Sequence, residues 1–278
     1  MMPWALLGIL YIVCAILCAV GFYKFVYFLS IGYGFAVAGG GIAILIMYFI
    51  NPLYNGETVA HAWIMVITAI LFVIYGARLS GFLLIRELKN ITFRKTDVAK
   101  DTLAKNGEKK MPIFVLLTIW VSVAALYVTQ VSPMLFRYTN GSFDITLPII
   151  GFVISIAGLI LETVADNQKS RQKKERPDMV ATKGLYKMCR CPNYLGEIIF
   201  WTGVFVGGIS TYTGFGQWAM AIFAYIAIVF IMFNGAQRLE KRQMARYGKD
   251  EEYNTYANKT PIIIPLLPIY HLNKVEKK

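Results

Sequence analysis

The sequence is dominated by long apolar blocks that are separated by short polar connections. A helix of about 20 residues crosses the ~30 Å hydrocarbon core of a bilayer and satisfies its own backbone hydrogen bonds there. Hydrophobic residues make up 57% of the 278 residues and charged residues only 16%, whereas a soluble domain has about 45–50% and about 25%. The sequence therefore predicts an all-α, polytopic integral membrane protein of about seven transmembrane helices. These are expected at Pro3–Gly21, Val26–Ile50, His61–Ile85, Met111–Val131, Ile145–Ala165, Leu195–Ser210 and Phe215–Gly235. The sixth block is short and rich in glycine, so a six-span arrangement with that block at the interface stays open.

The basic residues fall almost entirely on one side of this arrangement. Of the 28 lysines and arginines, all but Arg137 lie in the connections 22–25, 87–110, 166–194 and 236–278 or in the last turns of the third span. By the positive-inside rule, the N-terminus is outside and the C-terminus cytoplasmic. The net charge of +12 suits anionic lipid headgroups, and no base-reading module accompanies it, so we expect membrane lipids and not nucleic acid as partners. The expected location is the inner or plasma membrane of a bacterium, or the endoplasmic reticulum of a eukaryote.

Polar side chains at the ends of the spans are the candidates for function, because such groups are expensive near lipid. Glu162 and Asp166, at the end of the fifth span, are four residues apart and share one helical face. After Pro192, Asn193 is expected to cap the sixth helix, with Glu197 one turn inside it. Carboxylates and an amide beside the basic loop 169–176 suit a ligand that carries hydroxyls and phosphates. Helix capping alone is the alternative for the second group.

Two further sets stand at span ends. Arg238, Arg242 and Arg246 follow the seventh span at intervals of four residues. Three guanidiniums on one face of a helix could bind the phosphates of a ligand or anchor the helix at the lipid headgroups. The sequence favours neither interpretation for Arg238 and Arg242, and it favours the anchor for Arg246. Tyr75 lies one turn deeper than Arg78 in the third span, and its hydroxyl needs a partner, either a neighbouring helix or a substrate carbonyl. Tyr33 is a weaker candidate of the same type.

The stretch from Glu162 to Pro265 resembles the steroid 5α-reductase family of membrane reductases. The matching motifs are Asp166, Arg171-Gln172-Lys173-Lys174, Gly184-Leu185, Asn193-Tyr194-Leu195-Gly196-Glu197, Arg238 and Tyr256…Ile263-Ile264-Pro265, with Tyr75-x-x-Arg78 upstream. The resemblance implies a single membrane domain over 1–278, with three helices on the substrate side (1–86) and a cofactor-binding part of four helices and cytoplasmic loops (110–278). The implied cofactor is NADPH on the cytoplasmic side, and the implied substrate is a lipophilic enone that enters from the bilayer, most simply a 3-oxo-Δ4 steroid.

Carried over residue by residue, the resemblance implies roles for individual side chains. Tyr75 is expected to polarise the substrate carbonyl, with Tyr33 as the second catalytic candidate and Arg78 as a substrate contact. The implied cofactor-binding residues are Glu162, Asp166, Arg171, Lys173, Asn193, Tyr194, Glu197, Arg238 and Arg242. This sequence departs from the pattern of the steroid 5α-reductase family at two places. Glu162 stands where some relatives have asparagine, and the second span has no Gln-Glu pair, its nearest equivalents being Ser30 to Tyr33.

Two other classes of protein compete with a reductase. Arg190-Cys191-Pro192-Asn193-Tyr194 and Glu240 are similar to motifs of the isoprenylcysteine and phospholipid methyltransferases, which use S-adenosylmethionine, but position 191 is cysteine where those enzymes have histidine. A transporter or receptor would carry ionisable groups near the midplane, and here they gather at the span ends. Two histidines and four cysteines form no recognisable metal-binding set, so no metal is expected.

Overall fold

The structure, a computed structural model, describes residues 2–50, 62–89 and 112–273, and within these ranges it is all-helical without strands. Seven helices in the described ranges are long and apolar enough to cross a membrane, which confirms the predicted fold class and includes the short sixth span. They are Trp4–Phe22, Phe25–Ile50, Ala62–Ile85, Ile113–Asn140, Thr146–Glu175, Pro192–Thr211 and Phe215–Tyr247. Their exposed faces carry large apolar side chains such as Ile12, Ile46 and Phe114, which suit lipid and not water.

The chain forms two compact units. Unit 1 comprises Met1–Ile145 and Gly208–Ala224, and unit 2 comprises Thr146–Gly207 and Tyr225–Lys278. Each unit is described by itself below. The expectation of one membrane domain over 1–278 stays a prediction, as does the cytoplasmic side of the C-terminus.

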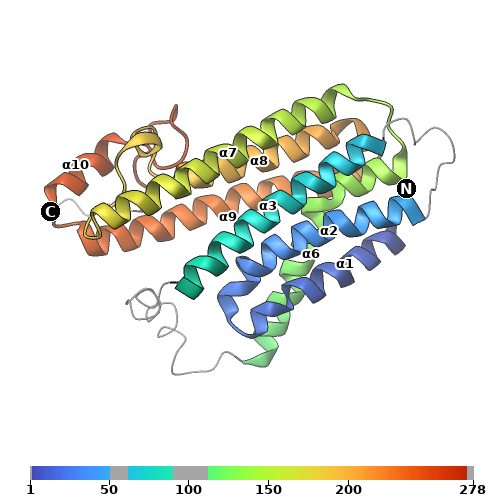
Figure 1. Cartoon of the computed structure of the whole chain (residues 1–278), viewed down its shortest axis with the longest axis horizontal. Helices are drawn as coiled ribbons and strands as arrows, with labels where there is room; N and C mark the ends of the chain where they lie inside the picture. Colours follow the sequence, from blue (N-terminus) through green and yellow to red (C-terminus); the bar gives the residue numbers. More distant parts are fainter. Residues whose placement is uncertain (1, 51–61, 90–111, 274–278) are drawn as a thin grey trace. The chain divides into compact units, whose positions relative to one another are not determined.

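Unit 1 is built on α1 (Trp4–Cys18), α2 (Ile31–Ile50), α3 (Ala62–Lys89) and α6 (Ile113–Asn140), drawn in blue to green in Figure 1. Glycines allow α2 and α3 to meet backbone to backbone: a Cβ on Gly76 would lie 2.2 Å from the carbonyl oxygen of Gly34. Small residues at helix contacts are the usual way to pack helices in lipid. Ser80 reinforces this contact, because its hydroxyl donates to the Ile31 carbonyl at 2.8 Å.

The fourth span runs further than hydropathy predicted. The sequence ends it at Val131, just before Pro133, but α6 continues through Pro133 to Asn140. Pro133 has no N–H for the carbonyl of Thr129, and the Ser132 hydroxyl donates to that oxygen instead at 2.7 Å. The helix ends at Gly141, whose φ of 63° is left-handed.

Arg137 is therefore not a loop residue, as the sequence suggested, but lies in the last turn of α6. Its guanidinium donates to the Asp144 carbonyl at 3.2 Å and to the Ser210 hydroxyl at 3.2 Å. The side chain is buried. It thus fixes the chain that leaves α6.

Unit 2 is built on α7 (Thr146–Glu175), α8 (Pro192–Gly208) and α9 (Phe215–Tyr247), with the short α10 (Glu251–Lys259) after them; α7, α8 and α9 run side by side in Figure 1. A Cβ on Gly158 of α7 would lie 2.4 Å from the Phe200 nitrogen, and one on Gly203 of α8 would lie 2.3 Å from the Gly151 carbonyl. The two helices therefore pack with their backbones in contact along several turns.

Two helix boundaries in unit 2 correct the sequence predictions. The basic run 169–176 was expected to be a loop, but α7 continues to Glu175 because no Pro or Gly interrupts its good helix formers before Pro177. Glu162 and Asp166 are therefore inside the helix and not at its C-terminus. Asn193 is not the N-cap of α8: the helix begins at Pro192, and the Cys191 carbonyl accepts from the backbone nitrogens of Tyr194 and Leu195.

Candidate functional site in unit 2

Two glutamates are buried at the contact between α7 and α8. Glu162 is 5% exposed and Glu197 is 4% exposed. A Cβ on Gly196 would lie 2.7 Å from the backbone nitrogen of Glu162, so the glycine next to Glu197 brings the two helices together at this point. The indole of Trp201 donates to the Glu197 carboxyl at 3.1 Å. Buried carboxyl groups are costly, so this pair is a strong candidate for function.

A second group of predicted residues gathers around Tyr194 at the start of α8. The Tyr194 ring packs against Gly235 of α9, where a Cβ would lie 3.4 Å from it. Asp166 follows Glu162 by one turn on α7, and Arg238 and Arg242 follow Gly235 by one and two turns on α9, so all three lie near this end of α8. Three helices, α7, α8 and α9, thus bring together four residues that the sequence singled out separately.

Arg238 and Arg242 keep their charges available. Both are exposed, and neither guanidinium forms an ion pair or hydrogen bond within the described ranges. They lie one turn apart on α9, so they share a face. Arg246, one turn further, lies over the ring of Tyr247 at 5.3 Å. The first two arginines are therefore the ones placed to bind an anion.

The two basic residues of α7 that were expected to contact a cofactor interact with other groups of the protein. The ammonium group of Lys173 donates to the carbonyls of Pro177 and Met179 and to the Tyr247 hydroxyl. A lysine has three N–H donors, and these three acceptors match that number. Arg171 is exposed and pairs with Glu175 at 3.3 Å. Lys173 thus anchors the segment after α7.

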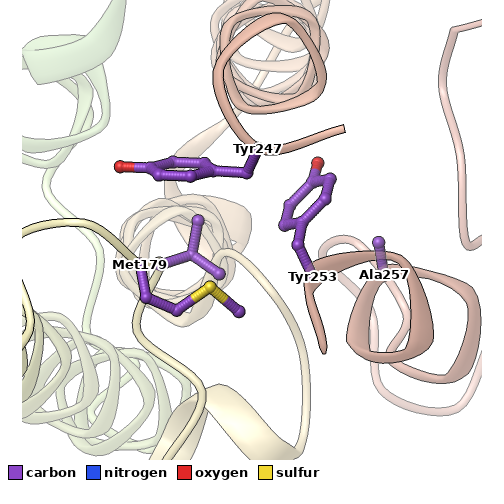
Figure 2. Close-up of a cluster of buried hydrophobic side chains, with 5 residues drawn as sticks. Met179, Tyr247, Tyr253 and Ala257 are labelled. Atoms are coloured by element: carbon purple, nitrogen blue, oxygen red, sulfur yellow. The ribbon is translucent and has the colours of Figure 1, made fainter. Parts of the chain in front are cut away.

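The segment anchored by Lys173 packs into a small apolar cluster (Figure 2). Its buried members are Met179, Val180, Tyr247, Tyr253 and Ala257, contributed by the loop after α7, by the end of α9 and by α10. Figure 2 shows the two tyrosine rings beside Met179, and their centroids are 6.0 Å apart. This cluster holds α10 against the ends of α7 and α9.

Glu240 is the residue whose position the sequence reasoning missed. Its side chain is 1% exposed and forms an ion pair with Arg190, which is 2% exposed. The carboxyl also accepts from the backbone nitrogens of Leu272 at 2.8 Å and Asn273 at 3.0 Å, and it lies 2.9 Å from Nδ1 of His271. We call Glu240, Arg190 and residues 270–273 the C-terminal clamp.

The C-terminal clamp fixes the start of α8. Arg190 also donates to the Tyr270 carbonyl through its side chain and to the Pro261 carbonyl through its backbone nitrogen, at 2.8 Å for the latter. Next to it, Ile262 and Ile263 are buried with Cys191, and Tyr194 packs against this cluster. Ile262 and Ile263 thereby help to hold the Tyr194 side chain in place.

The two cysteines beside the clamp are inert thiols. Burial raises the pKa of Cys189 to about 11 and that of Cys191 to about 12. A thiolate is the reactive form of cysteine, so neither serves as a nucleophile at neutral pH. Burial likewise raises the pKa of Tyr186, with the Asp166 charge as the next cause.

The predicted substrate residues lie in unit 1. Tyr75 is fully buried, and its ring meets Tyr33 edge-on, with centroids 5.9 Å apart. Tyr33 stacks on Tyr127 at 5.0 Å, and the Tyr127 hydroxyl donates to the Phe28 carbonyl at 2.5 Å. We call Tyr33, Tyr75 and Tyr127 the tyrosine trio. Arg78, one turn along α3, is half-buried.

The chain is similar to a protein family of unknown function and to a plant reductase. A family model described as "Protein of unknown function (DUF1295)" matches residues 35–260. The chain is similar to steroid 5-alpha-reductase DET2 of Arabidopsis thaliana, with 26% identity over 98 residues, which is 34% of this chain and 32% of that protein. The chain thus spans about a third of the length of the curated relative it matches. No solved structure is significantly similar. Together these matches suggest the 5α-reductase-like superfamily.

Proposed function

The chain belongs to the DUF1295 family, and on this premise we propose that the protein is an NADPH-dependent membrane reductase. Its reaction reduces the C=C bond of a lipophilic enone, with a 3-oxo-Δ4 steroid as the first candidate, to the 5α-reduced ketone. The partial likeness to a plant steroid 5-alpha-reductase supports the reaction class. The single observation that carries the cofactor assignment is that Gly196 and Tyr194 of α8 contact Glu162 of α7 and Gly235 of α9, which brings the turns with Asp166, Arg238 and Arg242 to the start of α8.

These residues fit a dinucleotide phosphate. Arg238 and Arg242 are exposed and have no partner within the described ranges, and guanidiniums bind phosphates in bidentate fashion. The carboxyl groups of Glu162 and Glu197 accept hydrogen bonds, which suits ribose hydroxyls or the nicotinamide carboxamide. Asn193, in the first turn of α8, adds an amide. Lys173 is already engaged, so the phosphate contacts fall to α9 in this proposal, with exposed Arg171 as a further cation.

In unit 1, Tyr75 would act on the substrate carbonyl. NADPH, when bound, supplies a hydride. An enone that received this hydride at its β-carbon would gather negative charge on the carbonyl oxygen as an enolate and would then take a proton at the α-carbon, with water as the simplest source. The Tyr75 hydroxyl donates to the oxygen on which charge develops, and a donor at that place lowers the barrier. Tyr33 holds the Tyr75 ring by its edge-on contact.

The first test is a titration of the purified protein in detergent with NADPH, NADH and S-adenosylmethionine, followed by thermal stability. A ligand present at 100 times its Kd stabilises the folded state by about 2.7 kcal/mol. NADPH should raise the melting temperature, and Arg238→Gln and Arg242→Gln should each weaken that effect. Arg246→Gln is the matched control, because Arg246 lies over Tyr247; its NADPH affinity should stay at the wild-type value.

Each result has a definite meaning. If the two α9 variants lose affinity for NADPH but not for NADH, the arginines bind the 2′-phosphate, and equal losses assign them to the diphosphate. Stabilisation by S-adenosylmethionine instead would favour the methyltransferase alternative. If none of the three compounds binds, the proposed function is wrong.

A further inference from the structure

The buried amide of Gln130 in unit 1 is not hydrogen-bonded within the described ranges. Gln130 of α6 is 2% exposed, and neither its amide oxygen nor its amide nitrogen has a hydrogen-bond partner in the part of the chain that the structure describes. The other buried glutamine of unit 1 behaves in the usual way: the Gln217 oxygen accepts from the Asn140 amide at 2.7 Å and from the Thr213 backbone nitrogen at 3.0 Å. Native interiors rarely leave buried amides unpaired, so Gln130 needs an explanation.

The contacts of nearby residues with α2 show where Gln130 lies along the helices of unit 1. Next to it on α6, Val131 contacts Gly40, where a Cβ would lie 3.2 Å from the valine side chain. Two residues before Gly40, Ala38 contacts Gly76 of α3, where a Cβ would lie 2.8 Å from that of Ala38. The same stretch of α2 thus meets α6 at Val131, the residue after Gln130, and α3 at Gly76.

Tyr75 precedes Gly76 on α3 and Gln130 precedes Val131 on α6, so both residues lie next to contacts with the stretch from Gly34 to Gly40 of α2, which is about two helical turns long. The tyrosine trio connects the two helices. Tyr127, one turn before Gln130 on α6, stacks on Tyr33, and Tyr33 contacts Tyr75. The Tyr127 hydroxyl donates to the Phe28 carbonyl, whereas the Gln130 amide has no hydrogen-bond partner within the described ranges. An unmatched amide therefore lies one helical turn from a member of the tyrosine trio.

We propose that the Nε2–H of Gln130 is a second hydrogen-bond donor to the carbonyl oxygen of the lipophilic substrate, alongside the Tyr75 hydroxyl. This inference rests on the proposed reductase function. A carbonyl oxygen has two lone pairs and accepts two donors.

The test uses the full-length protein in detergent and progesterone, a 3-oxo-Δ4 steroid, as the probe. Gln130→Leu keeps the approximate size of the side chain and removes the amide. It should raise the Kd for progesterone about tenfold, as expected for one lost hydrogen bond. Affinity for a steroid hydrocarbon that lacks the 3-oxygen should be unchanged. In turnover with NADPH, kcat should fall about 100-fold, the effect of removing one donor to a developing oxyanion.

The ligand-free protein supplies an independent readout. Because Gln130 has no partner to lose, Gln130→Leu should keep or raise the melting temperature. Gln217→Leu, the control, should lower it, because the amide of Asn140 and the nitrogen of Thr213 lose their acceptor. A fall of similar size in Gln130→Leu would overturn the proposal, since it would mean that the amide serves the packing.

The remaining outcomes separate this inference from the proposed function. Unchanged progesterone affinity in Gln130→Leu, or no progesterone binding by the wild-type protein, overturns the role of Gln130 even if NADPH binds. Failure of NADPH to bind overturns the reductase assignment, while a weakened progesterone complex in Gln130→Leu would still establish the oxygen-binding site.

Discussion

The C-terminal clamp offers a direct measurement of what a buried ion pair does in this protein. Glu240→Ala leaves the Arg190 guanidinium buried without its carboxylate and removes the acceptor for the nitrogens of Leu272 and Asn273. Removing one partner of a buried pair typically costs about 3–5 kcal/mol. We expect a loss of about 4 kcal/mol in the free energy of unfolding of unit 2. Glu240→Gln keeps one oxygen for the backbone nitrogens, so its loss should be smaller, about 2 kcal/mol.

Unit 2 contains its own control for this experiment. Arg176 and Glu252 form a bidentate pair, with contacts of 2.9 and 3.0 Å, but their side chains are 51% and 52% exposed. Water and salt screen exposed pairs, which therefore contribute much less to stability than buried ones. Glu252→Ala should therefore cost much less stability than Glu240→Ala, although the exposed pair has two contacts between its charged groups.

The assay is reversible unfolding in mixed detergent micelles, with double-mutant cycles for each pair and limited proteolysis in parallel. Glu240→Ala should also expose residues 261–273 to protease, because these residues are held through Arg190 and Glu240. Equal losses for the two pairs, or a protected chain end in Glu240→Ala, would refute the reasoning that burial and the C-terminal clamp set the cost.

Three further predictions concern other contacts. Cys191 should resist alkylation by iodoacetamide at pH 7.5 in the folded protein and react only on unfolding. Burial raises the pKa of its thiol from the ordinary value of 9.0 to about 12 in the folded protein. The contribution of this thiol should therefore make unit 2 less stable as the pH rises from 9 towards 12, because the unfolded chain loses the proton first. Gly203→Leu should destabilise unit 2 by several kcal/mol in the same unfolding assay, since even a Cβ would lie 2.3 Å from the Gly151 carbonyl. Tyr127→Phe should cost about 1–2 kcal/mol, read as a lower melting temperature, because the buried Phe28 carbonyl loses its donor.

The fold was predictable from the sequence because hydropathy reports directly which residues face lipid. Helix ends were less predictable, since a helix does not stop where the membrane does. The α7 helix runs on to Glu175 through residues that favour helix in water as well. In α6 the helix continues past the end of the predicted span at Val131, because the Ser132 hydroxyl satisfies the carbonyl that Pro133 leaves free. Hydropathy reports neither the helix propensity of polar residues nor a side-chain hydrogen bond to a free carbonyl.

The candidate site was predictable where its residues form local motifs. Glu162, Asp166 and Glu197 stand out because charges next to lipid are rare. The role of Glu240 was not visible, because its partners are 30 to 50 residues away in the chain and only packing brings them together. Gln130 was missed for another reason: an uncharged amide in an apolar span gives no signal until its lack of a partner is seen.

The partners of each polar group help to separate structural from functional roles in this protein. Glu240 is as buried as Glu197, but its carboxyl receives donors from a side chain, a histidine and two backbone nitrogens. Such a group is satisfied by its own chain and has little capacity left for a ligand. Arg242 and Gln130 are opposite cases, one exposed with its charge available and the other buried with its amide unmatched. Packing within the described ranges does not explain why Gln130 is polar. In our proposals Arg242 binds a phosphate and Gln130 binds a carbonyl oxygen, and the two titrations test these roles separately.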